Sequence, residues 1–178
     1  TVIVFGAGPI GLGVVAAANA KGARVIIAEP SQARIEVAKK LGAEASFDPS
    51  ASDAVEQAMK LTDGKGASVV FEASGKPQAM AMTFQVAAFR ARLVNIGINV
   101  GDSATAELGL IQSKELQVRG IIGSPGVWPE TIRFLARTGI DLSPLVTKQF
   151  DIADAALAYD AVLTDKSQIK VHVQSSAK

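Results

Sequence analysis

Short apolar runs alternate with longer segments of mixed polarity along the first 122 residues of the chain. The runs predict strands buried on both faces, because a strand with one solvent face would alternate apolar and polar residues. Six such strands are expected, at residues 1–5, 24–28, 45–48, 68–72, 92–96 and 116–122. Helices are expected between them, at residues 12–21, 31–41, 53–61 and 77–88. This order predicts an α/β fold with a doubly wound, mostly parallel six-stranded sheet and helices on both faces.

The pattern is looser after residue 97. Before the sixth strand, a loop is expected at residues 99–106 and a helical turn at 108–113. After it, helices are expected at residues 129–138 and 152–163, and strands at 146–150 and 169–173. The sequence shows no repeat, low-complexity tract or interdomain linker, so a single domain over residues 1–178 is predicted. The chain begins directly on a core strand without an initiator Met, which indicates a piece of something longer.

A G-x-G-x-x-G motif, Gly-Ala-Gly-Pro-Ile-Gly at residues 6–11, joins the first predicted strand to the first helix. Gly6 permits a tight turn, Gly8 lets a pyrophosphate approach the backbone, and Gly11 lets the helix lie close to the sheet. The helix N-terminus offers unpaired N–H groups to phosphates. Glu29 ends the second strand, 18 residues after Gly11 and close to the roughly 20-residue spacing of the acid that binds the adenosine ribose. This order predicts a Rossmann dinucleotide site.

Small residues follow several of the other predicted strands, at 73–75, 97–98 and 123–124. Ligand is expected across these carboxyl ends, at the switch point between the first and fourth strands. A plainer interpretation remains open for each position, because glycine ends many strands and an acid at a strand end is usually only solvated.

The composition of the chain argues against several classes of function. The 178 residues carry a formal net charge of +1, which gives no electrostatic case for binding nucleic acid or an anionic membrane. The first 20 residues are uncharged, but four glycines, Pro9 and Asn19 interrupt them, which argues against a membrane span. The chain has no cysteine, so it has no disulfide and no cysteine-ligated metal, and no metal ligand set is predicted.

Candidates for catalysis are scarce. Alcohol oxidation needs a zinc-bound alkoxide or a general base near the substrate oxygen. The single histidine, His172, lies in the last predicted strand, away from the expected crevice. Tyr159 is followed four residues later by Leu163, so the Tyr-x-x-x-Lys pattern of short-chain dehydrogenases is missing. The chain is therefore expected to bind a dinucleotide without oxidising an alcohol, and no catalytic residue is assigned.

The sequence resembles the cofactor domain of the medium-chain dehydrogenases, in particular the zinc-dependent branch that contains sorbitol and threonine dehydrogenases. The resemblance runs along the whole chain. The matching stretches are residues 4–12, 31–43, 70–75, 114–120, 128–129, 145–147, 150–152, 155–159 and 170–171.

The resemblance implies an oxidoreductase that transfers hydride between NAD and an alcohol or polyol in the cytoplasm. It also implies a preceding GroES-like domain that carries the catalytic zinc and that this chain lacks, with Lys170–Lys178 severed from it. By resemblance, Glu29 takes the ribose hydroxyls, Arg34 flanks the adenine, and residues after the fourth to sixth strands line the nicotinamide side. The full cofactor-binding set is Gly6, Gly8, Pro9, Ile10, Gly11, Glu29, Arg34, Ala73, Ser74, Gly75, Ile96, Gly97, Ile98, Ile121, Ile122 and Gly123. Sorbitol dehydrogenases commonly carry an arginine at the position of Gly123, which argues against a polyol substrate.

NAD is favoured over NADP, because Glu29 would accept a hydrogen bond from the ribose 2′-hydroxyl and repel a 2′-phosphate. Arg34 is the counter-indication, since a nearby arginine can accommodate that phosphate. Residues Leu116 to Ile122 are expected to form a sheet edge, which in the family pairs with a second copy to make a homodimer. Two alternatives stay open: a stand-alone NAD(H)-sensing regulatory module, and the cofactor domain of a zinc-free, NADPH-dependent quinone or enoyl reductase. Glu29 and Gly-Pro-Ile-Gly argue against the second.

Overall fold

The computed structural model describes residues 1–175. Residues 176–178, which end the expected single domain and the segment 170–178, lie outside the described residues. Six parallel strands form one sheet in the order β3-β2-β1-β4-β5-β6. Their bounds are β1 Val2–Phe5, β2 Val25–Ala28, β3 Ala43–Phe47, β4 Ala67–Glu72, β5 Ala87–Asn95 and β6 Gln117–Gly120. The predicted doubly wound α/β fold is confirmed, with its switch point between β1 and β4.

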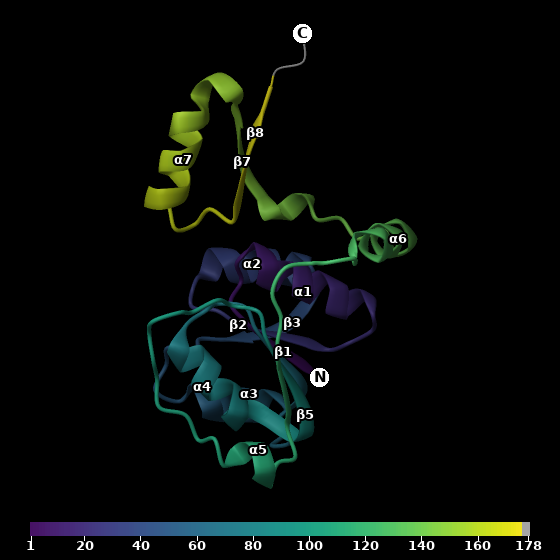
Figure 1. Ribbon diagram of the computed structural model, residues 1–178, viewed down its shortest axis with the longest axis vertical. Helices are drawn as coiled ribbons and strands as arrows, with labels where there is room; N and C mark the ends of the chain where they lie inside the picture. The colour runs from purple at the N-terminus through teal and green to yellow at the C-terminus, as the bar shows by residue number, and fades with distance from the viewer. Residues whose placement is uncertain (176–178) are drawn as a thin grey trace.

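Helices cover both faces of this sheet (Figure 1). Their bounds are α1 Pro9–Ala20, α2 Gln32–Lys40, α3 Ala54–Leu61, α4 Pro77–Val86, α5 Leu110–Ser113 and α6 Trp128–Thr138. Helices α1 and α2 lie on one face, and α3 and α4 lie on the other. The central strands β1 and β2 are therefore buried on both faces, which is why they consist of continuous apolar runs.

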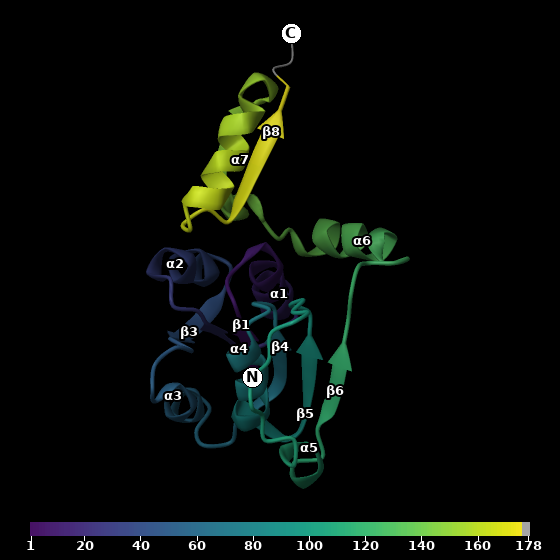
Figure 2. The same cartoon turned by 60° about the vertical axis from the view of Figure 1, so that its left-hand side comes forward.

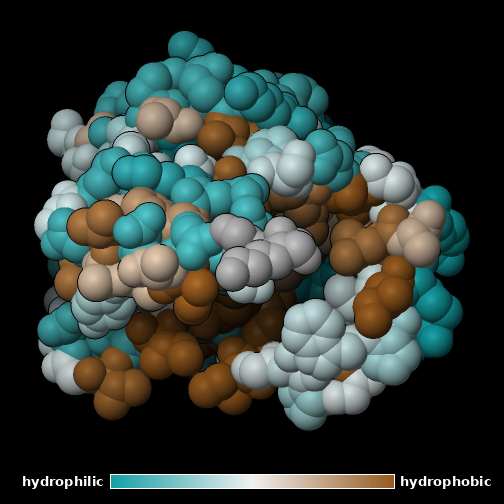
Figure 3. Space-filling model, turned by 90° about the horizontal axis from the view of Figure 1, so that it is seen from above, coloured by the Kyte–Doolittle hydropathy of each residue, from teal (hydrophilic) through white to brown (hydrophobic). Residues whose placement is uncertain are grey.

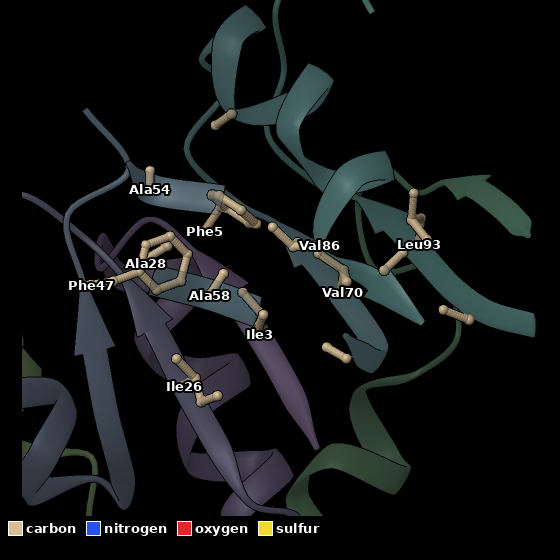
Figure 4. Close-up of a cluster of buried hydrophobic side chains, with 14 of the residues drawn as sticks. Ile3, Phe5, Ile26, Ala28, Phe47, Ala54, Ala58, Val70, Val86 and Leu93 are labelled. Carbon is tan, nitrogen blue, oxygen red and sulfur yellow. The ribbon is translucent and has the colours of Figure 1, made fainter. Parts of the chain in front are cut away.

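The core is divided by the sheet into two clusters. Alternate residues of β1 point to opposite faces, so Ile3 and Phe5 join one cluster and Val4 joins the other. Figure 4 shows the first cluster, in which the Phe5 and Phe47 rings meet edge to face with centroids 6.0 Å apart. Fully burying such a side chain contributes roughly 1.5–3 kcal/mol. This packing fixes β1, and with it the start of the glycine turn.

Two element boundaries differ from the sequence prediction for local reasons. Helix α1 begins at Pro9, three residues before the predicted start at Leu12, because proline is well suited to the first helical position and Gly8 takes the N-cap. Strand β6 ends at Gly120, so Ile121 and Ile122 follow the strand instead of belonging to it.

The junction of α4 and β5 was also predicted wrongly. The strand begins at Ala87, not at residue 92, and Ala87 pairs with Ala67 before the register shifts. Arg90 adopts a left-handed backbone with φ of 59° in this irregular stretch. The Lys114 ammonium donates to the carbonyls of Phe84, Gln85 and Ala87, so a residue from the next connection ends the helix.

A separate unit follows the six-stranded sheet. Strands β7 (Val146–Asp151) and β8 (Lys170–Gln174) form a two-stranded parallel sheet, joined by α7 (Ala155–Thr164), and they stand above α2 in Figure 2. Short 3₁₀ turns precede β7 and α7, at Ser143–Leu145 and Ile152–Asp154, so α7 begins later than the predicted residue 152. We name β7, α7 and β8 the C-terminal unit.

The C-terminal unit joins the rest of the molecule through Ile169, the residue before β8, which belongs to the apolar cluster that contains residues of α1 and α2. Ile169 is buried there beside the partly buried Leu142 and Leu145. Figure 3, which looks down on this side, shows brown apolar surface among polar patches. In the C-terminal unit, Leu157 and Leu163 of α7 are exposed apolar residues. Within residues 1–175, no helix combines the length and the apolarity that crossing a membrane requires.

Candidate functional site

A cavity of about 650 Å³ opens at the carboxyl ends of β1 and β4, on the switch point of the sheet. Six of the predicted cofactor residues line it together: Gly6, Gly8, Glu29, Arg34, Ala73 and Ser74. They come from the glycine turn, the end of β2, helix α2 and the loop after β4. Four segments that are distant in sequence therefore converge on one hollow, which is the usual form of a small-molecule site.

The protein's own packing requires glycine at some positions of the turn and not at others. Gly6 has φ of +90°, and a Cβ there would lie 2.9 Å from the Ser74 Cβ. A Cβ on Gly11 would lie 1.8 Å from the Gly6 carbonyl oxygen, so α1 can approach β1 only with glycine at this position. A Cβ on Gly8 would meet nothing within 4 Å.

Gly8 is therefore a glycine that the protein's own packing does not require. It is the N-cap of α1 and lines the cavity, with an ordinary φ of −77°. Its lack of a side chain leaves open space in front of the unpaired N–H groups of a helix N-terminus. Open space at a helix N-terminus is an arrangement that suits the binding of an anion.

Glu29 has a structural role that the sequence did not reveal. Glu29 is 6% exposed, and its carboxylate accepts the Ala7 N–H at 2.8 Å through Oε2 and the Ser31 N–H at 3.0 Å through Oε1. It thus ties the glycine turn to the start of α2. Each carboxylate oxygen has a second lone pair, so Glu29 can hold the turn and still accept a hydrogen bond from a hydroxyl group of a ligand.

Arg34 is tied to the C-terminal unit. Its Nη2 donates to the carbonyl oxygens of Lys166 and Gln168, at 2.9 and 3.0 Å, in the turn between α7 and β8. Its Nε is buried without a hydrogen-bond partner among the described residues. These carbonyls lie more than 130 residues further along the chain, and no local pattern indicates them.

Sequence reasoning missed Glu72, which shapes the loop after β4. This carboxylate is fully buried and accepts the N–H groups of Ser74 and Gly75 and the Ser74 hydroxyl. A Cβ on Gly97 would lie 2.5 Å from Glu72 Oε2 and 2.2 Å from Gly75 N. Gly75 and Gly97 are therefore packed against each other around this acid. An acid ending an otherwise apolar strand was the available signal.

Asp48, after β3, places a further negative charge beside the cavity. Its carboxylate accepts the N–H and the hydroxyl of Ser50, at 2.8 and 2.6 Å, and these bonds lower the pKa of Asp48. Ser50 itself lines the cavity. Asp48 is therefore held ionised near Glu29's end of the site.

The other predicted residues lie outside this cavity. Pro9, Ile10 and Gly11 begin α1, and Ile10 is exposed. Gly75, Ile96, Gly97 and Ile98 lie in the loops after β4 and β5, and Ile121, Ile122 and Gly123 follow β6. The exposed Ile98 and Ile122 leave this second half of the predicted site as an open edge.

The described residues show no metal site. No group of three or more His, Cys, Asp and Glu side chains is placed to hold an ion anywhere in residues 1–175. His172 lies on β8 and Tyr159 on α7, both exposed and both in the C-terminal unit. The side chains of this part of the chain therefore do not form a ligand set for a zinc ion.

Comparison with known proteins identifies relatives along most of the chain. Residues 9–137 match the family model described as zinc-binding dehydrogenase. The chain is 33% identical to scyllo-inosose 3-dehydrogenase of Thermotoga maritima over 96% of its length, and 37% identical to L-threonine 3-dehydrogenase of Pyrococcus abyssi over 84%. These alignments cover 45% and 44% of the relatives, so the chain spans about half the length of the curated relatives it matches.

Solved structures show the same fold. An E. coli alcohol dehydrogenase in complex with the cofactor NADH superimposes with a TM-score of 0.86 at 26% identity. The superposition covers 96% of this chain and 51% of that one.

Proposed function

The chain belongs to the zinc-binding dehydrogenase family, and on that premise we propose that it is the NAD-binding part of an alcohol or polyol dehydrogenase. The observation that carries this proposal is the cavity at the switch point, where a sterically free glycine at a helix N-terminus lies beside a buried acid. Pyrophosphate and ribose hydroxyls require these two groups next to each other.

Each half of the dinucleotide has proposed contacts. The turn from Gly6 to Gly11, including Pro9 and Ile10, would hold the pyrophosphate, and Glu29 and Arg34 the adenosine. The loops after β4, β5 and β6 would line the nicotinamide side, through Ala73, Ser74, Gly75, Ile96, Gly97, Ile98, Ile121, Ile122 and Gly123. When bound, the cofactor supplies the hydride chemistry, while these residues bind and orient it. The E. coli relative solved with NADH supports this assignment.

NAD is the proposed dinucleotide. Glu29 lines the cavity and would repel a 2′-phosphate, and Asp48, whose hydrogen-bond partner Ser50 lines the cavity, adds a second negative charge nearby. Glu29 retains acceptor capacity for a 2′-hydroxyl.

The chemical step is proposed to need a domain outside this chain. The relatives are about twice as long as the chain, which supports a catalytic domain that carries the zinc, the substrate contacts and the proton transfer. The chain by itself would then bind cofactor without turnover. We further propose a homodimer through β6, whose residues are exposed at the edge of the sheet, and a cytoplasmic location, which rests on the family resemblance alone.

Substitution of Glu29 tests the proposal. Glu29→Gln replaces one acceptor oxygen by an NH₂ group facing a backbone N–H, so we expect NADH affinity to fall about tenfold or more. The matched control is Glu44→Gln. Glu44 lies on β3, and its exposed carboxylate forms an ion pair with Arg24. Both affinities are measured by NADH fluorescence titration, with folding checked by circular dichroism. Equal NADH affinity in folded Glu29→Gln and Glu44→Gln would contradict the proposed site.

A further inference from the structure

The guanidinium of Arg34 lines the cavity and argues for NADP. Its hydrogen bonds decide which of its N–H groups are free to bind a phosphate. Arginine recognises phosphate best through a fork, in which two parallel N–H groups bind two oxygens. The planar group has two such forks, one formed by Nη1 with Nη2 and one by Nε with Nη2. Both forks therefore require an N–H of Nη2.

In this protein, both N–H groups of Arg34 Nη2 already donate to backbone carbonyls, so they are not available to a ligand. Nη2 makes two hydrogen bonds, to the carbonyls of Lys166 and Gln168, and these match its two N–H groups. Nε is buried. Of the guanidinium nitrogens, Nη1 alone remains to reach a phosphate, and it can do so only without a fork.

The turn that presents these carbonyls is held by its own hydrogen bonds. The Asp165 carboxylate accepts the N–H and hydroxyl of Ser167, at 2.9 and 2.5 Å, and the Gln168 amide at 2.7 Å. From β7, the Thr147 hydroxyl donates to Gln168 Oε1 at 2.7 Å and accepts the Ile169 N–H at 3.1 Å. The two carbonyls are thus positioned by the C-terminal unit, independently of the cavity.

We propose that the turn 165–168 is a remote determinant of cofactor specificity: it occupies both forks of Arg34 and so disfavours a dinucleotide with a 2′-phosphate. This inference rests on the proposed function, because it concerns the same cavity. It assigns to Asp165 and Thr147 a positioning role through Arg34, although neither lines the cavity. The apparent contradiction between Glu29 and Arg34 is then reduced, since Glu29 repels the phosphate and Arg34 cannot offer it a fork.

The test loosens the turn and measures NADH and NADPH binding to the full 178-residue chain by fluorescence titration. Asp165→Ala should free Nη2, so we expect NADPH affinity to rise about three- to tenfold while NADH affinity changes less than about twofold. Thr147→Val should act in the same direction from the other side of the turn. Adding Arg34→Ala to Asp165→Ala should abolish the gain.

The matched control is Asp141→Ala. Asp141 accepts the N–H and hydroxyl of Ser143 as Asp165 does those of Ser167, but its turn makes no hydrogen bond to Arg34 among the described residues. If the unaltered chain binds NADH and both turn variants keep its NADPH-to-NADH ratio, or if the gain persists without Arg34, the inference is overturned and the proposed function stands. If the folded, unaltered chain binds neither dinucleotide, both are overturned.

Discussion

Gly8 and Gly11 belong to one motif but answer to different physical demands. At Gly11 the demand is internal, because a Cβ would collide with the backbone oxygen of Gly6. At Gly8 no atom of the described residues lies within 4 Å of an added Cβ, so their packing does not require glycine there, whereas a bound ligand could. A sequence motif does not separate these cases, because it records only that both positions are glycine.

This difference predicts the effect of Gly8→Ala. We expect the free energy of unfolding to stay within about 1 kcal/mol of the unaltered chain, since φ at Gly8 suits alanine. NADH affinity should fall about tenfold or more, because the new methyl group enters the space proposed for the pyrophosphate. Urea unfolding and fluorescence titration measure the two quantities.

Gly13→Ala is the control for this substitution. Gly13 also has open space around its Cβ position, but it lies within α1 and does not line the cavity. It should gain up to about 1 kcal/mol of stability from the higher helix propensity of alanine, with NADH affinity unchanged. Equal NADH affinity in Gly8→Ala and Gly13→Ala would show that the motif is structural only.

Among the helices and strands, those whose residues show a clear pattern of apolar positions were predicted from the sequence. The strands of the sheet were found because burial on both faces leaves a continuous apolar run, as in β1 and β2. The α4–β5 boundary was missed because Ala87 and Ala88 favour a helix locally, while pairing with Ala67 and the Lys114 ammonium decides otherwise. Tertiary contacts of this kind leave no periodic signal.

The candidate site divides in the same way. The positions of Gly8 and Glu29 follow from a motif whose spacing the fold imposes. The bonds of Glu29 to Ala7 and of Arg34 to Lys166 depend on how separate segments meet, so they could not be predicted. Glu72 could have been noticed as a buried acid, but its bonds to the loop after β4 needed coordinates.

The turn between α7 and β8 has a pH dependence of its own. Hydrogen bonds from Ser167 and Gln168 lower the pKa of Asp165 from 3.8 to about 2. Because the folded pKa is the lower one, the stabilisation is fully present above the unfolded pKa near 4 and is lost as pH falls towards about 2. The turn should therefore hold Arg34 unchanged around neutral pH and loosen only in acid.

This prediction is checked by following the carboxyl ¹³C shift of Asp165 against pH. We expect a midpoint near 2 in the unaltered chain, and Asp165→Asn should remove the corresponding part of the acid dependence of unfolding. A midpoint at the ordinary aspartate value of about 4 would mean that the bonds to Ser167 and Gln168 do not persist in solution.

The whole molecule consists of a six-stranded sheet that carries the cavity and a C-terminal unit that contacts it through Ile169 and Arg34. The sheet carries the proposed dinucleotide site, and the hydrogen bonds from Arg34 to the turn after α7 are the proposed route by which residues outside the cavity affect cofactor preference. The exposed apolar side chains of α7 and the edge strand β6 are consistent with the proposed catalytic domain and second copy.

The central claim is that this chain is a dinucleotide-binding unit that prefers NAD. Its most direct test is calorimetric titration of the folded, unaltered chain with NADH and, separately, with NADPH. We expect saturable binding of NADH at one site per chain and weaker binding of NADPH. Tighter binding of NADPH would contradict the roles given to Glu29 and to the turn 165–168, and binding of neither would contradict the claim itself.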